Sequence, residues 1–103
     1  MALTLEWSEE ALEDIESIAT YIEKDSPTYA KSVVSKFFEK AEILQEFSEL
    51  GRKVPEFSDT TIREIFIYSY RLIYKLSKEK VLIVAIIHGK RLLENNLSHD
   101  QLK

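Results

Sequence analysis

Residues 81–87 read Val-Leu-Ile-Val-Ala-Ile-Ile, the longest unbroken apolar run in the chain. A strand with one exposed face alternates apolar and polar residues, whereas this run is apolar at every position, which indicates burial of both faces. We therefore predict a central strand over residues 80–88, covered by helices on one side and by a partner or the chain's own tail on the other. The run is also too short to cross a bilayer, which takes about 20 residues in a helix.

Two further β-like runs precede the central one, at residues 62–68 and 70–76. The first two runs join around Ser69 and the last two around residues 77–79, which is the spacing of β-hairpins. We expect a three-stranded antiparallel meander. Residues 48–61 lack a sustained period, so we predict a loop there.

The first half of the chain carries helical patterns. Residues 3–7 alternate as a short strand does, and Ser8 then caps a predicted amphipathic helix over residues 9–24. Ser26 and Pro27 start a second helix, whose apolar stripe runs from Ala30 to Phe47. The short connection makes the two helices an antiparallel hairpin. The predicted fold is α+β: an N-terminal strand, a helical hairpin and a meander, with the helices on one face of the sheet.

The chain has 103 residues, 45% of them hydrophobic, and a net charge of −4, which predicts a single domain over residues 1–103. Cysteine is absent, so no disulfide forms, and no signal-peptide pattern opens the chain. We expect a cytoplasmic protein that does not enter the membrane. Residues 94–103 form a weakly patterned tail.

The net charge conceals two unlike halves. Residues 1–50 hold twelve acidic residues and four lysines, whereas residues 51–103 hold six acidic and ten basic residues, including all four arginines. Such a split is consistent with two surfaces that meet different partners, or with a solvated acidic helix beside a mixed sheet.

The sequence lacks the residues that a metal site or a glycine-rich phosphate loop would require. The two histidines, His88 and His99, stand apart, so no metal site is expected. A glycine-rich phosphate loop cannot form from Gly51 and Gly89, and we expect no cofactor. Cations on the predicted sheet remain: if the meander gathers Arg63, Arg71 and His88, they could neutralise a phosphate and supply an acid or base, as a metal-free ribonuclease requires.

Five short strings occur in an order that resembles the RelE/ParE superfamily of type II toxin-antitoxin toxins, also called plasmid stabilisation proteins, and in particular its ParE-like branch. They are Trp7-Ser8-Glu9-Glu10-Ala11, Gly51-Arg52-Lys53-Val54-Pro55-Glu56, Ile62-Arg63-Glu64-Ile65, Tyr70-Arg71-Leu72-Ile73-Tyr74 and Ile87-His88-Gly89-Lys90-Arg91-Leu92-Leu93. The likeness spans about residues 3–93.

The resemblance implies a small toxin held inactive by a cognate antitoxin. ParE-like members inhibit DNA gyrase by binding it, whereas RelE-like members cleave mRNA on the ribosome without a metal. In the nuclease branch Arg63, Arg71 and His88 match catalytic positions, with Lys53 or Lys90 as auxiliary cations. An inactive relative that only binds antitoxin is a third reading.

The acidic pI of about 5.2 favours the gyrase reading, because RNA affinity comes largely from neutralising phosphates. The partners expected are an antitoxin, in a hetero-oligomer, and gyrase, with ribosome and mRNA as the alternative; a homodimer is a further assembly. The residues predicted to contact target or antitoxin are Arg52, Lys53, Tyr70, Tyr74, Lys90 and Arg91.

Overall fold

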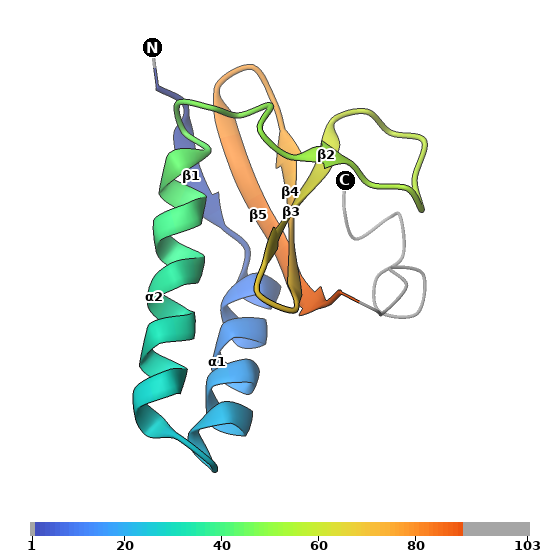
Figure 1. The fold of residues 1–103 in the computed structure, drawn as a ribbon. Coiled ribbons are helices and arrows are strands. Elements are labelled where there is room, and N and C mark those ends of the chain that lie inside the picture. Colours follow the sequence, from blue (N-terminus) through green and yellow to red (C-terminus); the bar gives the residue numbers. More distant parts are fainter. Residues whose placement is uncertain (1, 90–103) are drawn as a thin grey trace.

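The apolar run lies in strand β5 (Lys80–His88), and the rest of the sheet is built outward from it. The computed structural model describes residues 2–89. Strand β1 (Thr4–Trp7) pairs with β5 in parallel, and β4 (Tyr70–Leu76) pairs with it antiparallel on the other side. Strands β3 (Ile62–Ile67) and β2 (Arg52–Lys53) follow, which gives the order β1-β5-β4-β3-β2. The predicted meander is confirmed (Figure 1).

Two sequence expectations are corrected by the structure. The predicted loop over residues 48–61 contains a two-residue strand, β2, which pairs with Glu64 and Arg63 of β3. The second helix, α2 (Pro27–Ile43), ends before Phe47, which is 62% exposed. Leu44 is the last residue of the apolar stripe that reaches the core, so burial no longer supports the helix beyond it.

The helix caps form as predicted. The Ser8 hydroxyl accepts a hydrogen bond from the Ala11 N–H at the start of α1 (Glu9–Glu23) and donates one to the Val84 carbonyl, both within 3.0 Å. Ser26 accepts from the Tyr29 N–H at 3.1 Å. Both helices pack against the same face of the sheet (Figure 1).

Apolar side chains fill both faces of the sheet. The cluster between sheet and helices is centred on Phe37, Leu72 and Ile83, and the opposite face buries a second cluster that includes Ile73 and Ala85. A β-bulge at Val84 shifts the register, because Ile73 pairs with Ala85 whereas Tyr74 pairs with Ile83. Burial of β5 on both faces is therefore confirmed.

A segment between β2 and β3 covers part of the face away from the helices. Val54 is fully buried there, and Phe57 packs against the same cluster. This face was expected to be covered by a partner or by the tail. The tail, residues 94–103, lies outside the described residues.

The turn between β3 and β4 consists of Tyr68 and Ser69, since Ile67 pairs directly with Tyr70. Tyr68 has φ 55°, and among the described residues it alone combines a positive φ with a side chain. This left-handed conformation costs about 1–2 kcal/mol for an L-residue, and glycine or asparagine is the usual choice in such turns.

Candidate functional site

Arg71, a predicted catalytic residue, lies on the sheet face away from the helices and is bound by two carboxylates. Its Nε donates to Glu64 at 2.6 Å, and its two Nη atoms donate to the two oxygens of Glu56 at 2.8 Å each. The three side chains are 9% exposed or less. The hydrogen bonds from Arg71 to Glu56 are the main cause that raises the pKa of the guanidinium, against the opposing effect of burial.

Arg52 completes this arrangement from the edge strand β2. Its Nε donates to the second oxygen of Glu64 at 2.5 Å, and its guanidinium lies 5.1 Å from the centre of the Phe66 ring. We call Glu56, Arg71, Glu64 and Arg52 the arginine-carboxylate network. Two positive and two negative charges balance in it, so the charges of Arg71 and Arg52 are neutralised within the fold.

Arg63 lies on the opposite face, toward the helices, because it pairs with the core residue Tyr74. Its Nη1 donates to the Gly51 carbonyl at 2.9 Å, its Nη2 lies 3.6 Å from Glu49, and its buried Nε has no hydrogen-bond partner. Arg63 therefore holds the loop before β2 and keeps one donor unused.

Tyr74 is completely buried, and burial raises the pKa of its phenol. Its hydroxyl donates to the Ser48 carbonyl at 2.8 Å and accepts from the Gly51 N–H at 2.9 Å. A Cβ on Gly51 would lie 2.6 Å from that hydroxyl, so this close approach requires glycine. The position of Tyr74 does not support the prediction that it contacts a partner.

His88 lies at the exposed end of β5, on the helix side of the sheet, opposite Tyr70. The two rings are 6.0 Å apart. Arg71 is on the other face. Arg63 is two strands away from His88 and pairs four residues farther along β4, which separates them by about 13 Å along the strands and about 10 Å across them. The structure therefore does not bring Arg63, Arg71 and His88 together.

The remaining predicted contact residues divide into two groups. Arg52 and Lys53 are exposed on β2, and Tyr70 is half-buried at the start of β4. Lys90 and Arg91 lie outside the described residues. Within residues 2–89, no three side chains of the metal-binding types gather as a metal site would require. No helix in that range has the length and apolar character to cross a membrane.

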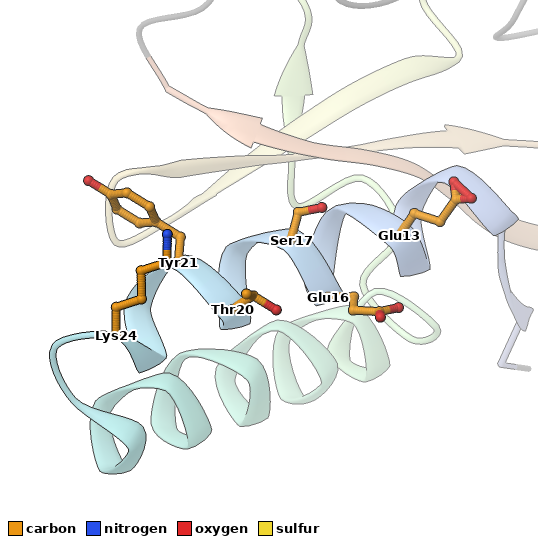
Figure 2. A pocket seen from close by; sticks show the side chains of 6 residues that line it. All are labelled: Glu13, Glu16, Ser17, Thr20, Tyr21 and Lys24. Atoms are coloured by element: carbon orange, nitrogen blue, oxygen red, sulfur yellow. The ribbon is translucent and has the colours of Figure 1, made fainter.

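Sequence reasoning missed a group of exposed tyrosines on the helical hairpin and the β3–β4 turn. Tyr21 and Tyr29 are 68% and 49% exposed, and Tyr68 is 53% exposed. Tyr21 stands out from the last turn of α1, at the end of a row of polar side chains that lines a shallow depression (Figure 2). These tyrosines come from three different elements, so only the positions of the rings in space reveal the group.

The architecture, a five-stranded mixed sheet with a helical hairpin on one face, defines the class of small α+β toxins to which the sequence strings pointed. The family model described as "ParE toxin of type II toxin-antitoxin system, parDE" matches residues 5–93. The chain belongs to this family. No curated protein sequence matches it significantly.

Solved structures of three toxins share the fold. The chromosomal ParDE toxin-antitoxin system of P. aeruginosa gives a TM-score of 0.71 at 18% identity, covering 86% of this chain and 98% of that one. A double arginine mutant of the E. coli toxin RelE in the free state gives 0.63 at 20% identity, covering 87% and 86%. The RelBE2 toxin-antitoxin complex of Mycobacterium tuberculosis gives 0.57 at 19% identity, covering 85% and 99%.

Proposed function

We propose that this toxin acts in the cytoplasm by binding DNA gyrase and inhibiting it, and that a cognate antitoxin neutralises it. Membership of the ParE family supports the gyrase target over the ribosome. In this proposal the toxin is a binding protein and performs no catalysis.

The state of Arg71 is the observation that carries the proposal. A nuclease that used Arg71 to hold a scissile phosphate would need free donors on its guanidinium. Here the Nε and both Nη atoms already bind Glu64 and Glu56. The other two candidates for phosphate chemistry, Arg63 and His88, lie on the opposite face of the sheet.

Charge supports a protein target as well. The net charge is −4, and the two arginines of the arginine-carboxylate network are offset by two carboxylates. RNA affinity rests largely on cations that replace counterions along the phosphate backbone. The balance of charge in this chain therefore supports recognition of a protein surface.

For the antitoxin we propose a segment that carries apolar anchors and acidic groups and contacts the basic half of the toxin. Arg52 and Lys53 are exposed on the edge strand β2, where a partner chain can reach them. Lys90 and Arg91 extend the predicted contact beyond the described residues.

The decisive experiment is induced expression in bacteria, with plasmid supercoiling and mRNA integrity measured separately, followed by a supercoiling assay with purified toxin and gyrase. The proposal predicts growth arrest, inhibited supercoiling and intact mRNA, all reversed by the antitoxin from the neighbouring reading frame. Normal supercoiling at high toxin concentration would contradict it.

Other outcomes identify the alternatives. Ribosome-dependent mRNA cleavage that disappears in His88→Ala and Arg63→Ala, with folding intact, would establish a RelE-like nuclease. Soluble, folded protein that never slows growth would establish an inactive antitoxin-binding relative.

A further inference from the structure

The β3–β4 turn presents an exposed aromatic ring on a strained residue. Tyr68 has φ 55° in a two-residue turn, a conformation that glycine adopts without steric cost. Its side chain is 53% exposed, so burial of the ring does little to offset the strain. A strained residue that gains little from packing is a candidate for a role outside the fold.

Two further exposed tyrosines belong to the helical hairpin. The Tyr29 ring, in the first turn of α2, lies 6.3 Å from the Tyr68 ring. Tyr21 is in the last turn of α1. Burial is the main cause that raises the pKa of Tyr70, and the phenols of Tyr29 and Tyr21 add to it. In Figure 1 the β3–β4 turn lies at the lower end of the sheet, alongside the helical hairpin, which extends beyond it. We call Tyr21, Tyr29 and Tyr68 the tyrosine tip.

Exposed tyrosines are common anchors of protein interfaces, because each offers a large rigid ring and a hydroxyl that still forms hydrogen bonds. A depression of about 590 Å³ adjoins Tyr68 and is lined by Lys31, Ser32, Ser35, Lys36 and Glu39. Lys36 is paired with Glu39 at 2.8 Å, which leaves the ammonium of Lys31 as the uncompensated charge of this lining. The depression is therefore suited to an acidic side chain.

The surrounding charges argue against a nucleic acid as the occupant. Only one uncompensated cation lines the depression, which lies on α2, and the neighbouring helix α1 carries six acidic residues and no basic one. A second copy of the chain would bring a second acidic α1 close to this one, which like-charge repulsion disfavours.

We propose that the toxin binds its target protein through the tyrosine tip. The target presents a carboxylate beside an apolar group, and the carboxylate pairs with Lys31. This inference rests on the proposed function and names its contact surface. The tip lies on the helix side of the sheet, away from the arginine-carboxylate network, so the target contacts a different region from the antitoxin contact proposed at Arg52 and Lys53.

The test separates stability from function at one residue. Tyr68→Gly removes the ring and relieves the backbone, so we expect an unchanged or higher Tm together with at least a tenfold loss of growth arrest and of gyrase inhibition. A merely structural tyrosine could not give this combination. Tyr68→Phe keeps the ring and should retain activity within about threefold. Ser69→Gly is the matched control in the same turn and should behave as the wild type.

Charge reversal tests the stated chemistry of the partner. Lys31→Glu should weaken gyrase inhibition about tenfold, whereas Lys78→Glu, an exposed lysine in the turn at the other end of the sheet, should not. Binding of purified antitoxin should be the same in every variant. Full activity of Tyr68→Gly would overturn the proposal. So would parallel loss of antitoxin binding, which would assign the tip to the antitoxin, or a change of oligomeric state, which would assign it to a second copy.

Growth arrest keeps the two proposals distinguishable. If the wild type arrests growth but leaves gyrase active, the proposed function fails, and the arrest caused by Tyr68→Gly and Lys31→Glu still tests the tip. If the wild type neither arrests growth nor inhibits gyrase, both proposals fail.

Discussion

The arginine-carboxylate network and the tyrosine tip differ in the exposure of their side chains. In the network, the side chains of Glu56, Glu64 and Arg71 are 9% exposed or less and satisfy one another. In the tip, each ring is about half exposed or more, and one sits on a strained backbone. Arg71, which the sequence suggested as a catalytic residue, is thus paired inside the fold, whereas the exposed rings belong to tyrosines to which the sequence analysis gave no role.

This difference has a physical origin. A buried charge is costly unless it is paired, so a cation on an inner strand attracts carboxylates from neighbouring segments during folding. A tyrosine carries no charge and tolerates an interface between water and protein. The charge of the strand residue Arg71 is therefore paired within the fold, whereas the tyrosine rings can stay at the surface.

The largest expected effect comes from breaking the network at its buried centre. Arg71→Ala leaves the carboxylate of Glu64 buried without its main partner and should lower the free energy of unfolding by about 3–5 kcal/mol. Urea denaturation followed by circular dichroism measures it. Arg52→Ala is the matched control, since Arg52 binds the same carboxylate but its side chain is 58% exposed, and should cost less than about 1 kcal/mol. Equal losses in the two variants would show that burial does not govern the network.

The next largest effect is expected when the same group, a tyrosine hydroxyl, is removed in the core and in the tip. Tyr74→Phe removes the hydroxyl that bridges Gly51 and Ser48, leaves a buried N–H without its acceptor, and should cost about 1–3 kcal/mol. Tyr68→Phe removes an exposed hydroxyl and should change stability by less than about 0.5 kcal/mol. Thermal unfolding of both variants measures the difference in destabilisation. A similar change in Tm in the two variants would contradict the prediction.

A pH titration tests a carboxylate that is half-buried without a cation. Asp14 accepts the Ile86 N–H at 2.9 Å; burial raises its pKa above 3.8, and Glu13 and Glu10 add to this against the opposing hydrogen bond. The folded state thus holds the proton more tightly than the unfolded state, and this contribution to stability is lost as pH rises from 3.8 through the raised pKa. Asp14→Asn should therefore gain stability relative to the wild type as pH rises across this window. A constant difference in unfolding free energy from pH 3 to pH 7 would contradict the assignment.

The smallest expected effect is at the outermost ring. Tyr21 is 68% exposed, so Tyr21→Ser should leave the free energy of unfolding within about 0.5 kcal/mol of the wild type. Denaturant unfolding checks this value. A larger loss would mean that the tip is part of the core after all, and would weaken the contrast with the network.

Several features of the fold could be predicted because their causes are local. Ser8 and Ser26 cap helices through bonds to residues three positions ahead, and the pattern of residues 81–87 requires burial on both faces. Strand β2 could not be predicted in this way. It has two residues, and it forms because β3, ten residues later, offers an open edge for pairing.

The candidate site was harder to predict because its contacts are distant in the chain. Alternation along a strand places Arg63 with Ile65, and Arg71 with Ile73, on single faces of their strands, as the structure has them. It did not reveal that these are opposite faces of one sheet, because that depends on the register between β3 and β4. Nor did it reveal Glu56 as a partner of Arg71, fifteen residues away.

The sequence by itself determined the order of strand, helical hairpin and meander, the helix caps and the membership of the toxin family, because these depend on local periodicity and on short strings. Only the tertiary structure decided which charged side chains are paired inside the protein and which aromatic rings are exposed. Pairing of Arg71 with Glu56 and Glu64, and the meeting of Tyr29 with Tyr68, require segments far apart in the chain to come together, and no local pattern records which of them will meet.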